Sequence, residues 1–352
     1  MASKVSLEQI AIALARVNYP GYQTDIVSLG MVEEVTPAAD GGYAITLRSG
    51  TDREEILRDL AARIHQALTH ELGVPKVEFK VRKIEPELGE KTGKVRLEGT
   101  RFIVAVASGK GGVGKSTVAA NLAAALSRIG YKVGLLDADI YGPSVPMMFG
   151  TGDERLRGAG GQSFYPVERF GVKLVSIGFF LNDKAPVIWR GPMVMGAVRQ
   201  FLKDTLWGTQ DFLIVDLPPG TGDAQLTLAQ EVAIDGAVIV TTPQDVALAD
   251  AMRAVRMFRQ VHCPLLGVVE NMSYFVCPDC GERDEIFGHG GGDKMAAGEN
   301  MEVLARLPIF TEVREAGDAG TPIVIAQPDH PASQAFIDLA RRVVAAMPGM
   351  LN

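Results

Sequence analysis

The segment FIVAVASGKGGVGKST, residues 102 to 117, constrains the fold of this 352-residue chain more than any other. An apolar run typical of a buried strand leads into a glycine-rich loop with the pattern G-x-x-x-x-G-K-[ST], and a helical pattern follows as far as Ile129. Glycines let the loop backbone approach a ligand closely, so that its N–H groups surround phosphate oxygens at a helix N-terminus. The segment therefore predicts a strand–loop–helix unit that binds phosphate.

The side chains of this loop predict Mg²⁺-ATP as the ligand. Lys115 is expected to reach the β- and γ-phosphates, and the hydroxyl of Ser116 is expected to coordinate Mg²⁺. The alternative, a glycine-rich turn without a ligand, does not explain why strand, loop, Lys-Ser pair and helix occur together. The residues expected to contact the nucleotide are Gly109, Lys110, Gly111, Gly112, Val113, Gly114, Lys115, Ser116 and Thr117.

Two further apolar runs end in aspartate. Asp216 closes the run FLIVD, where an unpaired carboxylate would be costly to bury, and we predict that it serves the Mg²⁺ site. Gly220 begins the flexible turn GTGD, which suits a sensor of the γ-phosphate. The run VGLLD leads to Asp137 and Asp139, of which Asp139 is expected to orient the attacking water and Asp137 to cap the next helix.

The remaining apolar runs define the fold class. Strands covered on both faces have nearly continuous apolar sequences, and helical segments separate these runs along the chain. We therefore predict an α/β fold with a mainly parallel sheet, helices on both faces, and ligands at the carboxyl ends of its strands. The predicted strands are FIVAVA, VGLLD, VKLVSI, FLIVD, GAVIV and LLGVVE.

The chain is predicted to contain two domains joined by a linker. Residues 1–84 are expected to form a small α+β domain, because a helix with the capping pattern Ser6-x-x-Gln9 precedes shorter alternating segments. Residues 85–100 are charged and glycine-rich, which is typical of a mobile linker. Residues 101–352 are expected to form the ATPase domain. Predicted elements of the first domain are strands at 26–35, 43–47 and 77–81 and a helix from 54.

Composition excludes several function classes. The net charge of -7 disfavours electrostatic binding to nucleic acid or to an anionic membrane. No apolar run approaches the roughly 18 residues that cross a bilayer, and the N-terminal segment has the pattern of a helix rather than of a signal peptide. Three cysteines are too few for a disulfide framework, so we expect a cytoplasmic location.

Two of those cysteines, Cys277 and Cys280, form a C-x-x-C pair, which is half of a typical metal site. A zinc site completed by His289, and by Asp293 in addition, is one alternative. A redox-active pair is another, although no helix is evident directly after it. Cys263 precedes a predicted buried strand and is interpreted as a small apolar residue.

The loop also carries an early lysine, Lys110, giving GKGGVGKS. This resembles the deviant P-loop of the dimeric MinD, ParA and nitrogenase-iron-protein class of ATPases. The resemblance implies that Lys110 crosses a homodimer interface to the partner's phosphates, which couples nucleotide binding to dimerisation. A solvated loop lysine is the alternative.

Five further segments narrow the resemblance: DADIYGPS at 137, WRGPM at 189, DLPPGTGD at 216, VENMSYFVCPDCG at 269 and REAGDAGTP at 314. Together they resemble the Mrp-type (ApbC-like) iron-sulfur cluster carriers over residues 100 to 345. The resemblance implies a [4Fe-4S] cluster held by Cys277 and Cys280 of two subunits, transfer to apo iron-sulfur client proteins with assembly factors as partners, and Asn271 against the adenine base. The first domain is similar to the MIP18-like assembly domain, through TDIVSLGMV at 24.

Three hypotheses follow. The leading one is an ATP-switched cluster carrier. A spatial organiser of the MinD or ParA kind would need a basic tail or patch, and the last helix has only Arg341 and Arg342 as cations. An electron-transferring ATPase of the nitrogenase kind takes its cysteine ligands from two separate loops, whereas here they are adjacent.

Overall fold

The computed structural model describes residues 5–18, 20, 25–27, 31–38, 42–49, 54–83, 94–139, 142–160, 163–180, 191–277 and 279–347. The chain divides into two compact units. One comprises residues 1–89 with 344–352, and the other residues 90–343.

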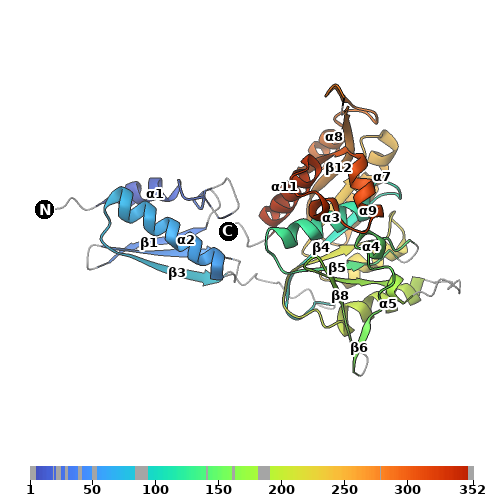
Figure 1. Ribbon diagram of the computed structural model, residues 1–352, viewed down its shortest axis with the longest axis horizontal. Coiled ribbons are helices and arrows are strands. Elements are labelled where there is room, and N and C mark those ends of the chain that lie inside the picture. The colour runs from blue at the N-terminus through green and yellow to red at the C-terminus, as the bar shows by residue number, and fades with distance from the viewer. Residues whose placement is uncertain are drawn as a thin grey trace. The chain divides into compact units, whose positions relative to one another are not determined.

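The first unit is a three-stranded sheet with helices packed beside it (Figure 1). Strand β2 pairs antiparallel with β1 and parallel with β3. Its core consists of fully buried side chains from both helices and the sheet: Ile10, Leu14, Ile45, Leu47, Leu60, Ile64 and Leu68. The elements are α1 (Leu7–Leu14), β1 (Val32–Pro37), β2 (Tyr43–Ser49), α2 (Glu54–Gln66), the π-helical turn η1 (Ala67–Glu71) and β3 (Val77–Lys83).

The helices and strands of this unit agree with the sequence predictions except at the first strand. The Ser6 hydroxyl accepts a hydrogen bond from the Gln9 amide at 3.2 Å, and the Ser6 amide donates to the Gln9 side chain at 2.9 Å, which confirms the capping box. The strand expected at 26–35 begins only at Val32, because the Asp25 carboxylate accepts from the Val27 amide at 3.0 Å and turns the chain there. Residues 28–30 lie outside the described part of the chain.

The second unit contains a sheet of nine strands among its described residues, in the order β13-β12-β11-β4-β10-β5-β9-β8, with β14 paired to β12. All six predicted strands are present and run parallel; only the edge strands β8 and β13 pair antiparallel. The strands are β4 (Thr100–Ser108), β5 (Val133–Asp137), β8 (Val167–Arg169), β9 (Val172–Ser176), β10 (Gln210–Asp216), β11 (Gly236–Thr241), β12 (Leu265–Val276), β13 (Arg283–Asp284) and β14 (Val303–Ile309).

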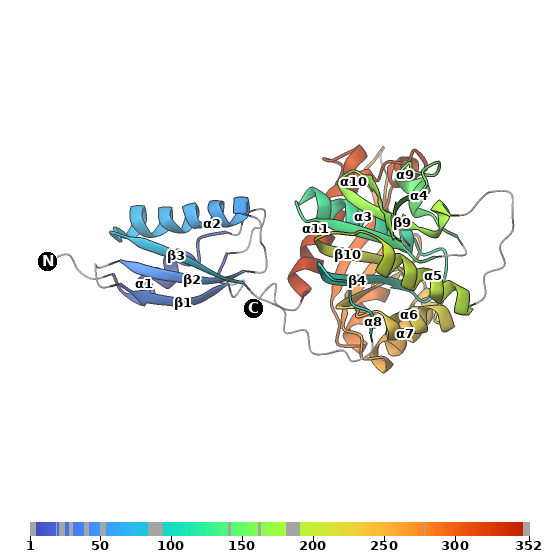
Figure 2. The ribbon, with the colours of Figure 1, turned by 90° about the horizontal axis from the view of Figure 1, so that it is seen from below.

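Helices cover both faces of this sheet, as predicted. Figure 2 shows α3 and α10 on one side and α6 and α7 on the other. A separate two-stranded hairpin joins β6 to β7. The remaining elements are α3 (Lys115–Arg128), α4 (Val145–Met148), β6 (Arg157–Gly160), β7 (Ser163–Tyr165), α5 (Gly191–Asp204), α6 (Asp223–Glu231), α7 (Asp245–Gln260), α8 (Gly291–Gly298), α9 (Thr311–Asp318), α10 (Ile323–Ala326) and α11 (Pro331–Ala346).

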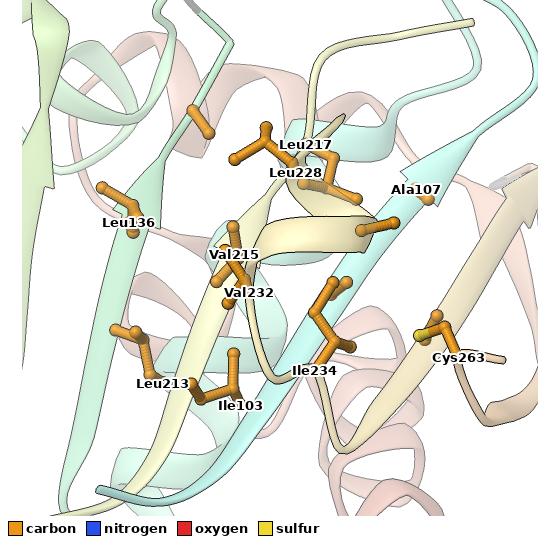
Figure 3. Packing of buried hydrophobic residues seen from close by; sticks show 14 of the residues in the cluster. Ile103, Ala107, Leu136, Leu213, Val215, Leu217, Leu228, Val232, Ile234 and Cys263 are labelled. Atoms are coloured by element: carbon orange, nitrogen blue, oxygen red, sulfur yellow. The ribbon is translucent and has the colours of Figure 1, made fainter. Parts of the chain in front are cut away.

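The apolar core under the sheet fixes the positions of its strand ends. Figure 3 shows Leu213 and Val215 of β10 in one cluster with Ile103 of β4 and Leu228 of α6. These side chains are fully or almost fully buried, and each buried aliphatic side chain contributes about 2 kcal/mol to folding. Cys263 takes part in the same cluster and is 5% exposed, which confirms its interpretation as a small apolar residue.

The predicted linker 85–100 is only partly described, since residues 84–93 lie outside the described part. Its last residues pack onto the second unit. The Val95 amide donates to the Glu231 carbonyl at 2.6 Å, and Arg96 pairs with Asp235 at 3.2 Å. Leu97 is buried in the core.

Candidate functional site

Three adjacent strands of the second unit bring the phosphate loop and two aspartates to one edge of the sheet. Strand β10 lies between β4 and β5, and Asp216 is in register with Val106 on one side and Asp137 on the other. The loop that follows β4 therefore begins beside both carboxylates. This is the carboxyl edge at which parallel sheets bind ligands.

The loop itself has the backbone that its glycines allow. Gly112 and Gly114 have φ angles of 81° and 82°, in the left-handed region, and Gly114 caps the N-terminus of α3. A Cβ on Gly109 would lie 2.1 Å from the backbone carbon of Asp250 in α7, so glycine is required there by close approach. The Ser108 hydroxyl closes the start of the loop by donating to the Lys110 carbonyl at 2.9 Å.

Lys115 is folded inward onto the acidic residues. Its Nζ lies 2.6 Å from Asp216 Oδ1, 3.8 Å from Asp139 Oδ2 and 3.1 Å from the Ser116 hydroxyl. The lysine is 5% exposed and Asp216 is fully buried. The structure thus places three predicted site residues around the ammonium group of a fourth.

The donor set at this point suits a Mg²⁺ ion. Asp216 Oδ2 is buried and has no hydrogen-bond partner among the described residues, so one carboxylate oxygen remains available for a cation. The Ser116 hydroxyl accepts a hydrogen bond from Lys115, the same lysine that pairs with Asp216, so a second oxygen donor lies nearby. Oxygen donors of this kind, completed by water and nucleotide phosphate, are the ligands that Mg²⁺ takes.

Asp137 has a structural role. Its carboxylate accepts hydrogen bonds from the Asp139 amide at 3.1 Å, the Ser176 hydroxyl at 3.0 Å and the Val145 amide at 3.3 Å. Val145 is the first residue of α4, whose N-cap residue Ser144 makes no capping hydrogen bond, so Asp137 satisfies an amide at the start of that helix, as predicted. Complete burial and the neighbouring Asp216 carboxylate raise the pKa of Asp137 from 3.8 to about 7.

The turn after Asp216 is tied to the phosphate loop. Gly220 has a φ of 92°, and its amide donates to the Ser108 carbonyl at 3.0 Å. A displacement of the loop would therefore be transmitted to the turn that leads into α6. This placement is compatible with the predicted sensing role of Gly220.

Asn271 contacts the phosphate loop and a neighbouring cavity. Its side-chain amide donates to the Val113 carbonyl at 2.9 Å, and a Cβ on Gly114 would lie 2.2 Å from the same nitrogen. The cavity, of about 470 Å³, adjoins α3 and is mostly apolar. Its walls include Thr117, Asn271, Met272, Phe287, Ile309, Phe310 and Phe336.

The two cysteines lie at the tip of a β-hairpin formed by β12 and β13. The Gly281 amide donates to the Cys277 carbonyl at 2.9 Å, and the Cys277 amide donates to the Glu282 carbonyl at 2.9 Å. Gly281 takes the left-handed conformation that closes the turn, with φ of 71°.

The sulfur of Cys277 is prepared to carry negative charge. Backbone N–H groups of Cys280 and then Asp279, together with the Cys280 side chain, lower the pKa of Cys277 below its usual value of 9.0. Cys277 is half-buried and Cys280 is exposed. The thiolate, rather than the thiol, is the form that binds metal.

The alternative zinc ligands have other partners. His289 Nδ1 lies 2.8 Å from Glu285 Oε2, and Asp293 forms an ion pair with Arg306. Within the described ranges, no three His, Cys, Asp or Glu side chains are grouped so that they could hold a metal ion. The cysteines are followed by a turn and β13 rather than by a helix, which removes the context of a thioredoxin-like pair.

Sequence reasoning missed two features of this region. Glu270 is 2% exposed and accepts hydrogen bonds from the Ser273 hydroxyl at 2.5 Å and the Gly292 amide at 2.6 Å. A carboxylate at the end of the run LLGVVE was a visible signal, of the same kind as Asp216. The apolar cavity was not foreseen, because segments distant in sequence form its walls.

Comparison with known proteins identifies the family. The sequence profile described as "ParA: NUBPL iron-transfer P-loop NTPase" matches residues 99–344. The chain belongs to the NUBPL iron-transfer P-loop NTPase family. This membership confirms the predicted resemblance, the fold class and the ATPase assignment.

Relatives of this family extend over most of the chain. The "Iron-sulfur cluster carrier protein" of Synechocystis is 43% identical over 343 residues, covering 96% of this chain and 97% of the relative. The protein of the same name from Aquifex aeolicus is 54% identical over 258 residues, covering 73% of this chain and 71% of the relative.

Solved structures agree with the fold of the second unit. A nucleotide-binding protein from Archaeoglobus fulgidus in complex with ADP is 40% identical with a TM-score of 0.60, and the match covers 68% of this chain and 94% of that one. The cell division ATPase MinD of Pyrococcus furiosus, at 24% identity and a TM-score of 0.52 over 69% of this chain and 98% of that one, shares the fold. In the described part of the chain, no helix is both long and apolar enough to span a membrane.

Proposed function

We propose that this NTPase is an ATP-dependent iron-sulfur cluster carrier, in which Cys277 and Cys280 of two copies hold a [4Fe-4S] cluster as cargo and release it to apoproteins. The observation that carries the proposal is the exposed cysteine hairpin. It presents two thiols of which one has a lowered pKa, and the described part of the chain adds no third ligand nearby. A cubane cluster takes four cysteines, so two copies complete the set. The carrier name of the relatives supports the same cargo.

The phosphate loop supplies the switch. Its N–H groups and the α3 N-terminus bind the phosphates, and Lys115 exchanges its contact with Asp216 for the β- and γ-phosphates. Ser116 and Asp216 would hold Mg²⁺, which would supply positive charge against the phosphates. Asp139 orients the attacking water. Lys110, half-exposed in the loop, reaches the partner's phosphates in the homodimer.

The cavity beside α3 receives the adenine base. It is mostly apolar and adjoins the loop through Gly114 and Thr117, and one polar group, the Asn271 side chain, lies in its wall. An amide both donates and accepts, which suits the edge of a base. Asn271 must release the Val113 carbonyl, or share its second amide hydrogen, to do so.

Anaerobic reconstitution tests the cargo assignment. The full chain is loaded with iron and sulfide, and its visible absorption, iron content and mass in solution are measured. We expect about four iron atoms per dimer, and none retained in Cys277→Ala. Cys263→Ala is the matched control, because this thiol is buried in the core and its loss leaves loading intact.

Two results would refute the assignment: a stable chromophore in Cys277→Ala, or a loaded species that is a single subunit. The loaded protein is then mixed with an apo iron-sulfur protein. Transfer of iron and sulfide supports a carrier, and transfer of electrons alone supports the nitrogenase-like alternative. ATP-dependent co-sedimentation with DNA or vesicles that persists without the two cysteines would support the spatial organiser.

A further inference from the structure

Both arms of the cysteine hairpin start from the wall of the cavity assigned to the base. Asn271 and Met272 of β12 line that cavity on the way into the hairpin, and Phe287 lines it on the way out. Cys277 and Cys280 lie between them in the sequence. The thiol pair is therefore carried by a loop that is anchored at both ends in one cavity.

Phe287 also borders a second cavity, of about 410 Å³, whose walls include Leu248 and Met252 of α7 and His289. The residue is half-buried and has empty space on two sides. A ligand that fills the first cavity removes the space on one side only.

Hydrogen bonds to Glu270, the neighbour of Asn271, join the two arms at the base of the hairpin. The Glu270 carboxylate accepts from Ser273 on the entering arm and from the Gly292 amide on the leaving arm, at 2.5 Å and 2.6 Å. Glu270 is 2% exposed, so these bonds are shielded from water. A displacement of Phe287 would therefore move the hairpin relative to residues that the Glu270 hydrogen bonds hold in place.

The entering arm contains an irregularity that allows such a movement. Asn271 pairs with Leu307 and Phe275 with Ile309, so the four steps from 271 to 275 on β12 lie opposite the two steps from 307 to 309 on β14. Met272, within this bulge, has a φ of 54°, which is unusual for a residue with a side chain. Bulges of this kind locally free a strand from its partner.

We propose that Phe287 is a positioning residue that transmits occupancy of the base cavity to the Cys277–Cys280 pair. It rests on the proposed function, in that a nucleotide base occupies the cavity. A base in the cavity restricts the motion of the Phe287 side chain. Phe287 in turn restricts the arm that leaves the hairpin, so the two thiols react more slowly. Nucleotide state thereby reaches the cluster ligands within one subunit, in addition to any effect at a dimer interface.

Thiol kinetics of the full apo chain test this proposal. In a Cys263→Ala background, which leaves only the hairpin thiols, the reduced protein reacts with 5,5′-dithiobis(2-nitrobenzoate) with and without saturating ADP. We expect ADP to slow the reaction about fivefold, within the usual range of coupling between sites. In Phe287→Ala, and in Phe287→Leu should the alanine variant fold poorly, the ratio of rates falls to about one.

Two variants control for changes on the same arm. Ile286→Ala removes an exposed apolar side chain next to Phe287 that lines neither cavity, and it keeps the full response to ADP. Phe287→Tyr retains the ring and the response. The inference is overturned if ADP slows the thiol reaction of Phe287→Ala as much as that of the Cys263→Ala protein. It is also overturned if calorimetry shows that ADP binds the Cys263→Ala protein and the rate does not change. Neither result contradicts the proposed function. If the Cys263→Ala protein binds no ADP, the proposed function fails with the inference.

Discussion

The phosphate-binding edge and the cysteine hairpin belong to the same sheet but are built in opposite ways. At the edge, Lys115 and Asp216 are buried and neutralise each other at 2.6 Å. At the hairpin, Cys280 is exposed and a Cβ on Gly281 would meet no atom within 4 Å. One site is closed on itself, and the other is open and incomplete.

This difference shows where each site obtains its missing part. The buried edge already contains the charges that a nucleotide would meet, so its ligand must displace an internal ion pair. The hairpin has only two sulfurs, and in the proposed function a second copy of the chain supplies the other two. The buried ion pair restricts which ligand the first site accepts, whereas the exposed thiols of the second are open to solvent, which suits the exchange of cargo that we propose.

The largest effect expected concerns Lys115. Lys115→Ala leaves the buried Asp216 carboxylate without its cation, which should cost about 4 kcal/mol in the free energy of unfolding. It should also weaken Mg²⁺-ATP binding at least about 100-fold, because a charge-assisted contact to the phosphates is lost. Chemical denaturation and calorimetric titration of the same sample measure the two effects.

Lys110→Ala is the matched control within the same loop. This lysine is half-exposed, so we expect the free energy of unfolding to stay within about 0.5 kcal/mol of the parent. Unchanged ATP affinity in Lys115→Ala would overturn the assignment of the loop. If Lys110→Ala lost as much unfolding free energy as Lys115→Ala, burial of the Lys115–Asp216 pair would not explain the effect.

The pH dependence of stability should show the burial of Asp137. Its pKa is raised from 3.8 to about 7 in the folded chain, chiefly by desolvation and also by Asp216. Between these values the folded state keeps a proton that the unfolded state has lost. The contribution of Asp137 to the free energy of unfolding therefore declines by about 4 kcal/mol as the pH rises from about 4 to about 7 and then levels off.

Asp137→Asn isolates this contribution, since the amide does not ionise in that range. Urea unfolding of both proteins at several pH values gives the difference, in which other titrating groups cancel. We expect the stability of the variant to fall less steeply between about pH 4 and pH 7. Parallel profiles would show that the carboxyl group titrates alike in the folded and unfolded chains.

The sequence predicted those parts of the site whose signals are local. Strand, loop and helix around Lys115 occupy consecutive residues, and Asp216 ends a run of apolar residues, so both could be placed without a structure. The strand β14 was missed because Arg306 and Pro308 interrupt its apolar run. Its presence in the sheet depends on pairing with β12.

Contacts between distant segments could not be predicted. Asn271 donates to Val113, 158 residues away in the sequence, and Glu270 joins the two arms of the hairpin. Periodicity reports which face of an element is apolar, but it does not report which element packs against it. For the same reason Leu7, at an apolar position of α1, is 53% exposed whereas Ile10 is fully buried.

The smallest contrast compares one substitution in the two regions. A Cβ on Gly109 would lie 2.1 Å from the Asp250 backbone, so Gly109→Ala forces apart the loop and α7 and should cost about 3 kcal/mol in unfolding free energy. Gly281→Ala meets open space and only adds left-handed strain, about 1 kcal/mol. Denaturant unfolding measures both. Equal losses would mean that the hairpin turn is as tightly packed as the phosphate loop, and the distinction between a closed and an open site would fail.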